Sequence, residues 1–250
     1  MQSSHPVKLC RLDALGTLGY DVRDIFDAFS VDKTASSWSP HVGFWNHDAK
    51  KVRTIAQKPN ATLLARDKPL EGRKLKDATV VWSKAGRILL VSRLWPVTHR
   101  VIATGYERNV LGNTWWGFDD SNLDENQRKA LLLWLNSTLG LMSYFGRRAI
   151  TRSAWMQMKK PAWSSMPVLD IRLLPEATLA SLGKSYDMLA KLDLAPIAQL
   201  DADIARQAID KAICSAFALP DLQPIRELLA REPGLSAERI GPAFGIGEEN

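Results

Sequence analysis

The sequence predicts an α+β fold: a mostly antiparallel, curled sheet with a buried helix, followed by a helical C-terminal region. Short runs rich in β-branched and aromatic residues recur between residues 61 and 118, separated by turn residues, as is typical of successive antiparallel strands. A broad apolar pattern over 119–146 indicates a helix buried on most sides. After residue 170, apolar residues recur at helical spacing.

The strands follow a segment of mixed character. Apolar positions 22, 25, 26 and 29 indicate a short amphipathic helix, and the chain from there to residue 60 is rich in aromatic and turn residues. Two β-rich runs on either side of Ala85-Gly86 indicate a hairpin. We therefore expect strands over 61–65, 79–83, 87–93, 101–104 and 114–118, with a turn over 107–112.

The helices are predicted from caps, periodicity and prolines. Ser121 or Asn122 can cap the long helix, and 136–138 is where it would break if it splits in two. Two prolines exclude a continuous helix over 147–169. This segment should end in a short strand at 166–169. Three further helices are expected over 175–192, 201–218 and 224–231. The predicted parts are a lead-in segment (1–60), an α/β domain (61–170), a helical region (171–232) and a flexible tail (233–250).

Charge is distributed unevenly along the chain, whose formal net charge is +6. Residues 1–169 contain 25 Lys and Arg against 14 Asp and Glu, whereas residues 170–250 contain 8 against 13. The stretch 126–169 has seven basic residues and no acidic one. A basic body favours a polyanion such as nucleic acid, and an acidic C-terminal part favours protein or solvent. An ordinary solvated basic surface gives the same counts, so charge alone leaves both interpretations open.

The sequence lacks the motifs of several catalytic classes. It contains no Pro-Pro, so it has no Asn/Asp-Pro-Pro-aromatic loop to grip a target amino group, and no glycine-rich turn or phosphate loop for a nucleotide cofactor. We therefore expect no catalytic site and no cofactor. His41, His47 and Asp48 are the only hint of metal chemistry, but the His pair lacks helical i, i+4 spacing. Two isolated cysteines and the absence of a signal core or spanning apolar run predict a cytoplasmic protein with no membrane association.

One segment resembles a known family. Residues 131–145, Leu-Leu-Leu-Trp-Leu-Asn-Ser-Thr-Leu-Gly-Leu-Met-Ser-Tyr-Phe, are similar to the helix that carries a Leu-Asn-Ser-x-Leu/Pro-Gly element in target-recognition domains. Those domains occur in type I restriction specificity subunits and in large adenine-N6 DNA methyltransferases. The order of strand block, helix, basic loop and Met166-Pro-Val strand matches as well, and residues 200–232 resemble the C-terminal tails of the methyltransferases. The resemblance covers roughly residues 60–232 and includes no catalytic domain.

The resemblance implies sequence-specific binding of double-stranded DNA on behalf of a catalytic partner. The basic loop 147–160 is the candidate phosphate clamp, and polar residues at strand ends and turns are candidates for reading base edges. The expected DNA-binding residues are Arg93, His99, Arg100, Arg108, Asn113, Arg147, Arg148, Arg152, Lys159 and Lys160. The expected partners are duplex DNA and the catalytic subunit of a methyltransferase or phage-defence complex.

Two other functions remain open from the sequence. The chain could be an assembly subunit without direct DNA readout, whose basic surface docks on an acidic partner and whose acidic helical region 170–232 serves a second contact. A metal nuclease that uses His41, His47 and Asp48 ranks last.

Overall fold

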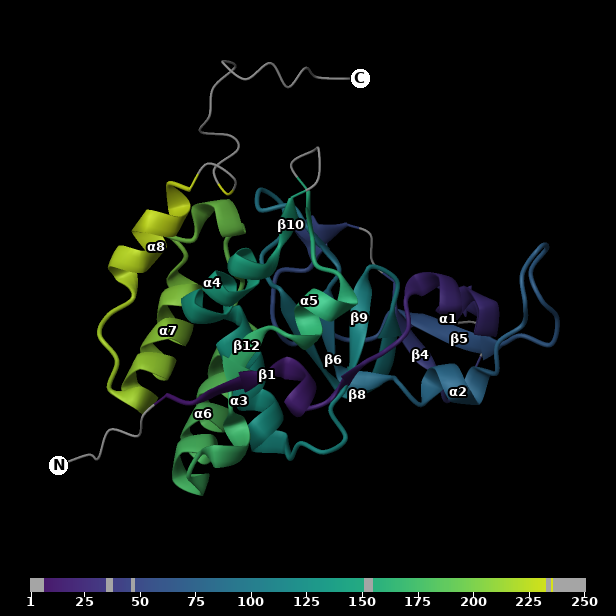
Figure 1. The fold of residues 1–250 in the computed structure, drawn as a ribbon, viewed down its shortest axis with the longest axis horizontal. Helices are drawn as coiled ribbons and strands as arrows, with labels where there is room; N and C mark the ends of the chain where they lie inside the picture. Colours follow the sequence, from purple (N-terminus) through teal and green to yellow (C-terminus); the bar gives the residue numbers. More distant parts are fainter. Residues whose placement is uncertain (1–6, 35–37, 46–47, 151–154, 233–234, 236–250) are drawn as a thin grey trace, which may run out of the picture.

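A curled seven-stranded sheet of order β2-β9-β6-β8-β4-β5-β3 forms the centre of the structure (Figure 1). Its strand pairs are antiparallel except for β4 with β8, so the predicted α+β class is confirmed. The computed structural model describes residues 7–34, 38–45, 48–150, 155–232 and 235. The strands are β1 (Leu9–Arg11), β2 (Thr17–Leu18), β3 (Phe29–Asp32), β4 (Val42–Phe44), β5 (Ala61–Ala65), β6 (Gly86–Val91), β7 (Arg93–Leu94), β8 (Ala103–Gly112), β9 (Trp115–Asp119), β10 (Ala149–Ile150), β11 (Met156–Gln157) and β12 (Pro167–Leu169).

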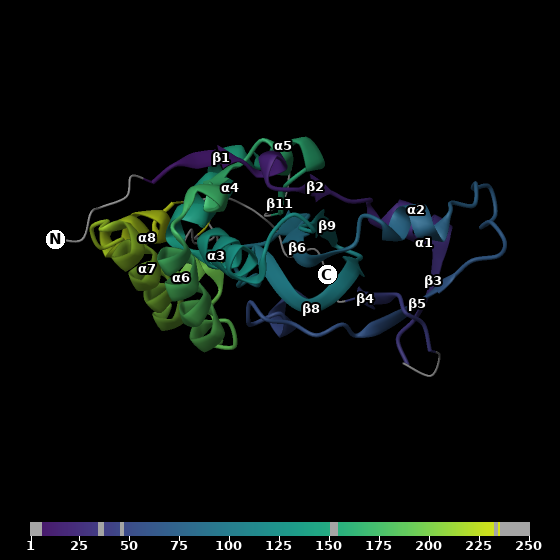
Figure 2. The ribbon, with the colours of Figure 1, turned by 90° about the horizontal axis from the view of Figure 1, so that it is seen from below.

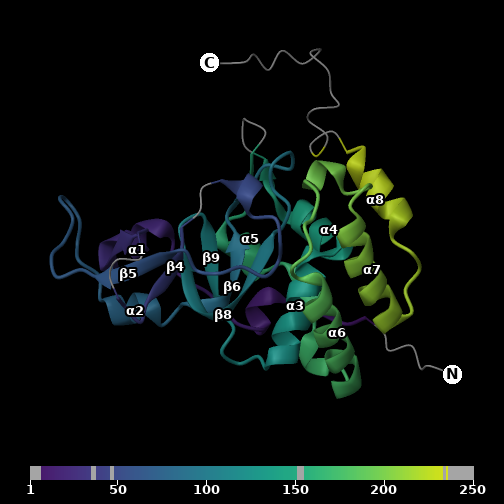
Figure 3. The same cartoon turned by 180° about the vertical axis from the view of Figure 1, so that it is seen from behind.

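The helices lie mainly at the two ends of this sheet. Figures 1 and 3 show α6, α7 and α8 together at one end, with α1 and α2 at the other. A view turned by 90° shows α3 between the sheet and the C-terminal helices (Figure 2). The α-helices are α1 (Val22–Ala28), α2 (Ala78–Trp82), α3 (Glu125–Asn136), α4 (Thr138–Arg147), α5 (Lys160–Ser164), α6 (Glu176–Leu189), α7 (Ile204–Phe217) and α8 (Gln223–Ala230), and 3-10 turns cover Leu12–Ala14, Ala49–Lys51, Ile171–Leu173 and Ile197–Gln199.

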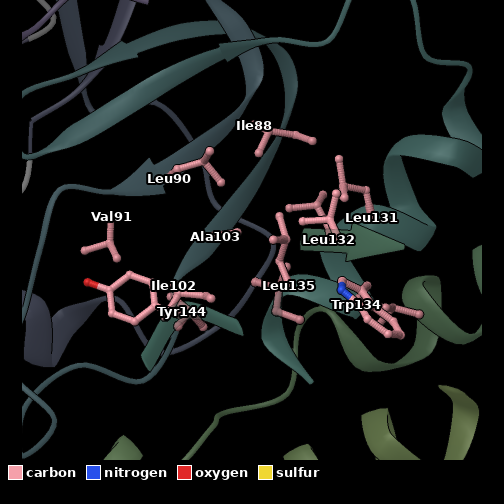
Figure 4. Close-up of a cluster of buried hydrophobic side chains, with 14 of the residues drawn as sticks. Ile88, Leu90, Val91, Ile102, Ala103, Leu131, Leu132, Trp134, Leu135 and Tyr144 are labelled. Atoms are coloured by element: carbon pink, nitrogen blue, oxygen red, sulfur yellow. The ribbon is translucent and has the colours of Figure 1, made fainter. Parts of the chain in front are cut away.

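The main core lies between the sheet and α3. Leu131, Leu132 and Leu135 of α3 point toward Ile88 of β6 and the start of β8, as Figure 4 shows. These side chains are at most 1% exposed. Burying each large aliphatic side chain contributes about 1.5–3 kcal/mol, so this contact is a principal source of stability. The long apolar stripe of the sequence is therefore explained by a helix buried on the sheet.

A second, smaller core lies at the far end of the sheet. Ile25 of α1 packs with Phe29, Leu63 and Val81 around strands β3 and β5. The loop over 66–77 projects from this end, beyond α2 (Figure 1).

Three local predictions are wrong. Residues 78–82 form helix α2 rather than a strand, because Asp77 caps them by accepting the backbone N–H groups of Thr79 at 2.7 Å and Val80 at 3.3 Å. Residues 107–112, expected to form a turn, instead continue strand β8. The pairing of β8 with β6 shifts in register between Gly86 and Ile88. The long helix begins after Asp124, which forms a capping box with Gln127, rather than at Ser121 or Asn122.

The break in the long helix is confirmed at Ser137, which ends α3 and caps α4. The lead-in segment 1–60 supplies β2, β3 and β4 to the seven-stranded sheet, and β1 pairs with β12. Apart from the buried Leu235, the expected tail 233–250 lies outside the described residues. Among the described residues, no helix combines the length and apolar character needed to cross a bilayer.

Candidate nucleic-acid interface

Two strands of a small three-stranded sheet, of order β10-β11-β7, lie within the basic segment 147–160. Gln157 of β11 lies opposite Arg93 of β7 and opposite the start of β10. The backbone N–H of Met158 donates to the Ser92 carbonyl at 3.0 Å, and the Trp116 indole N–H donates to the Met158 carbonyl at 3.1 Å. These bonds fix β11 to the edge of the central sheet near β9.

The side chains of β11 alternate between core and surface. Met156 and Met158 are buried, whereas Trp155, Gln157 and Lys159 face outward. This two-residue period is the one expected of a strand with one buried side.

On the neighbouring strand, Leu94 is buried and Arg93 is exposed. Extending the register by one residue places Trp95 opposite Trp155, and their ring centroids are 5.8 Å apart. We call the outward surface formed by Arg93, Trp95, Trp155, Gln157 and Lys159 the β7–β11 face.

Two more cations adjoin this face along the chain, one just before β10 and one directly after Lys159. Arg147 ends α4 and donates from Nη1 to the Ser165 hydroxyl at 2.7 Å. Lys160 begins α5 and donates from Nζ to the Gly19 carbonyl at 3.2 Å. Within the described part of the chain, Arg93, Arg147, Lys159 and Lys160 are exposed and none forms an ion pair. Their positive charge is therefore directed to solvent or to a polyanion.

Of the expected base-reading residues, His99 and Asn113 are buried and Arg100 is half-buried. His99 and Arg100 sit in a turn that the segment 194–198 covers: the Ile197 N–H donates to the His99 carbonyl at 2.9 Å, and Arg100 donates to the Leu194 carbonyl at 2.5 Å. Asn113 is buried where its backbone N–H meets the Phe44 carbonyl at 3.4 Å. The sequence places these polar residues in exposed turns, but elements distant in sequence pack over them.

The other expected residues are dispersed. Arg108 is exposed, but it lies near Val110, which pairs with Gly86 at the end of β6 remote from β7. The guanidinium of Arg148 is already bonded within the protein, to the Phe145 carbonyl at 2.7 Å and to the Glu232 carboxylate at 3.1 Å. Arg152 lies outside the described residues.

Burial gives His99 a pH-dependent effect on stability. Desolvation lowers the pKa of His99 to about 4, so the folded protein holds the ring neutral. In the unfolded chain the ring titrates near 6.5 and binds its proton first as the pH falls. Folded-state stability is then lost between about pH 6.5 and pH 4.

We predict that His99→Gln reduces the loss of unfolding free energy between pH 7 and pH 4.5 by about 2 kcal/mol relative to the parent. Urea denaturation of both proteins at the two pH values measures this difference. Equal losses in the two proteins would show that His99 is not the group responsible.

The segment that resembles target-recognition domains has a structural role here. The Asn136 side chain accepts the Ile102 N–H at 3.1 Å and donates to the carbonyls of Ala103 and Leu132, both at 2.9 Å. The Ser137 hydroxyl donates to the Trp134 carbonyl at 2.7 Å. The Asn-Ser pair therefore joins the break between α3 and α4 to the start of β8.

A buried ionic network continues from this break into the C-terminal helices. Asp210 of α7 accepts the Thr138 N–H at 2.8 Å and the Thr138 hydroxyl at 2.6 Å, and it pairs with Arg226 of α8. Arg206 of α7 donates to the carbonyls of Asn136 and, at 2.6 Å, Arg100. We call Asn136, Thr138, Arg206, Asp210 and Arg226 the interlock, because they bind the sheet unit to the C-terminal helices.

The residues considered for metal chemistry have other contacts. The His41 ring packs against Phe29 and Trp82, and burial lowers its pKa. The Asp48 carboxylate accepts the Lys50 N–H at 3.1 Å and caps a 3-10 turn. His47 falls outside the described residues, among which no three His, Cys, Asp or Glu side chains are grouped to hold a metal ion.

Neither Gln157 nor the two tryptophans of this face, Trp95 and Trp155, are among the candidate DNA-binding residues expected from the sequence. The signal was present, because Trp155, Gln157 and Lys159 alternate with Met156 and Met158. The nearby prolines favour an irregular segment, and a two-residue strand such as β7 is too short to be recognised from the sequence alone.

Comparison with known proteins returns no relative. No family model matches the chain, and neither a curated protein nor a solved structure is significantly similar to it.

Proposed function

We propose that this chain binds double-stranded DNA through the β7–β11 face together with Arg147 and Lys160. In this proposal it is a non-catalytic recognition module of a cytoplasmic restriction–modification or phage-defence system, and a methyltransferase or other catalytic subunit is its partner. The observation that carries the proposal is the placement of four exposed cations, free of ion pairs among the described residues, on and beside one small sheet. The system and the partner rest only on the sequence resemblance, which covers roughly residues 60–232.

The chemistry of the face suits a duplex. Lysine and arginine side chains neutralise phosphates and release counterions, which supplies affinity for any sequence. Gln157 has an amide that can both donate and accept, the combination that pairs with an adenine edge in the major groove. Arg93 lies opposite Gln157 and can reach either a phosphate or a guanine. The face therefore offers both non-specific and base-reading groups.

We expect the fourfold variant Arg93→Gln, Arg147→Gln, Lys159→Gln, Lys160→Gln to bind DNA at least about tenfold more weakly at moderate salt. If all four cations contact phosphates, the slope of log K against log[salt] should become shallower by roughly 3 to 4. Fluorescence anisotropy with labelled duplexes of several sequences, titrated at four or more salt concentrations, measures both quantities.

The matched control removes the same charge elsewhere. Lys33, Lys68, Lys74 and Lys184 are exposed on the β3–β4 loop, on the projecting 66–77 loop and on α6. Their fourfold change to Gln should leave the slope close to that of the parent. If both variants lose affinity equally, net charge rather than the β7–β11 face controls binding, and a parent protein that does not bind duplex even at low salt contradicts the proposal outright.

One observation favours the assembly-subunit alternative. Met188 of α6 and Ile204 of α7 are 68% and 79% exposed, and exposed apolar side chains on two helices that pack together suit contact with a protein. The acidic character expected of this region is reduced, because Asp203 and Asp210 are buried and paired. Absence of DNA binding in the titration above would make this alternative the better one.

A further inference from the structure

Trp155 combines exposure with rigid support. Its side chain is 40% exposed, although a tryptophan at the edge of a core is usually covered. The Trp95 ring lies 5.8 Å away at an interplanar angle of 42°, and the His99 ring lies 5.8 Å away, edge-on at 83°. Two rings therefore brace Trp155 while part of its surface stays open to solvent.

The support behind Trp155 is itself fixed. His99 is 8% exposed, and its Nδ1 lies 3.1 Å from the backbone nitrogen of Trp95, which holds the ring against the turn. The Ile197 N–H anchors this turn from the C-terminal region. A side chain braced in this way loses little conformational entropy on binding, which favours a role as a preformed platform.

The neighbours of Trp155 indicate the kind of ligand. Gln157 and Lys159 follow it on the same side of β11, and Arg93 lies opposite Gln157. An apolar protein surface offers these cations no counter-charge, whereas a nucleotide has a flat aromatic base and an anionic phosphate. Proteins that hold unpaired nucleotides combine these same two elements, an aromatic stacking surface and a positively charged track.

We infer that the Trp95–Trp155 pair is a stacking site for an unpaired nucleobase of a DNA ligand, with Arg93 and Lys159 holding the flanking phosphates. This inference rests on the proposed function, because it names the feature of DNA that the same face recognises. It adds that the chain prefers DNA with a base out of the helical stack over a fully paired duplex. In a duplex the faces of each base are covered by its neighbours, so Trp155 can stack only after a base has left the helix.

The test compares two DNA ligands that differ by one base. One is a 20-base-pair duplex and the other is the same duplex with a single unpaired adenine at its centre. Stacking of one base on an aromatic ring is worth about 1–3 kcal/mol, so the parent should bind the second ligand roughly tenfold more tightly. Trp155→Ala should bind both ligands equally with an unchanged salt slope, and Trp155→Phe should keep most of the preference.

Two further measurements separate stacking from a general loss of structure. Trp38 is 87% exposed on another loop, so Trp38→Ala is the matched control and should keep the full preference. With 2-aminopurine as the unpaired base, stacking on Trp155 should quench its fluorescence in the parent but not in Trp155→Ala. Circular dichroism and thermal unfolding confirm that each variant is folded.

The outcomes distinguish the two proposals. Salt-dependent binding without any preference for the unpaired base, or a preference that survives Trp155→Ala, overturns the stacking site and leaves duplex binding in place. A parent that binds neither ligand overturns both.

Discussion

Replacing Asp210 with alanine is expected to lower the free energy of unfolding by about 3–5 kcal/mol. Asp210 is 1% exposed and holds the guanidinium of Arg226 together with two donors of Thr138. Its removal leaves the buried Arg226 with only the exposed carboxylate of Asp221, 3.8 Å away, and leaves two buried donors of Thr138 without acceptors, and both are costly. Urea denaturation followed by circular dichroism at pH 7 measures the change.

An exposed ion pair of short length is the control. Asp193 lies 2.5 Å from Arg53, and about half of each side chain is exposed. Because solvent screens this pair, Asp193→Ala should change the free energy of unfolding by less than about 1 kcal/mol. Similar losses in the two variants would mean that burial does not set the energetic importance of the interlock.

The interlock has a consequence for function as well as stability. Its residues come from α4, α7 and α8 and from the end of α3, and Arg206 reaches the turn that supports His99 and Trp95. Buried hydrogen bonds from Arg206 of α7 thus connect the C-terminal helices to the turn behind the surface that is proposed to bind DNA.

The sequence predicts individual helices and strands better than it predicts which of them pair or pack together. The fold class, the buried helix and its break at Ser137 follow from apolar periodicity and from the capping preference of serine, both of which are local. The β-branched residues of helix α2 favour a strand, but the cap from Asp77 outweighs that preference. The role of residues 1–60 in the central sheet depends on long-range pairing, which leaves no local signal.

In the candidate site, too, local features are predicted from the sequence and long-range packing is not. Composition identifies the basic segment 147–160, and in the structure three of its cations are exposed at or next to the small sheet β10-β11-β7. His99 and Asn113 have the character of exposed turn residues, yet segment 194–198 and strand β4 cover them. Which polar turn remains on the surface is decided by tertiary packing, so residue type alone cannot identify base-reading residues.

Gly140→Ala is expected to destabilise the protein by about 3 kcal/mol or more, although alanine is the better helix former. A Cβ at Gly140 would lie 2.2 Å from the Trp134 carbonyl oxygen and 2.4 Å from that of Leu135. Both are backbone atoms, so relief requires moving the break between α3 and α4. That movement would disturb Asn136 and the bonds it makes to β8. Thermal and urea unfolding of the variant measure the loss.

The same substitution six residues later in α4 tests whether the close approach is responsible. A Cβ at Gly146 would meet nothing within 4 Å, and the residue is exposed. Gly146→Ala should therefore leave stability unchanged or raise it by up to about 1 kcal/mol, because alanine loses less backbone entropy in a helix. If Gly140→Ala lowers the free energy of unfolding and Gly146→Ala does not, residue 140 must be glycine because the backbones of α3 and α4 are in close contact there. If Gly140→Ala is tolerated as well as Gly146→Ala, the break between α3 and α4 is not held in the geometry described.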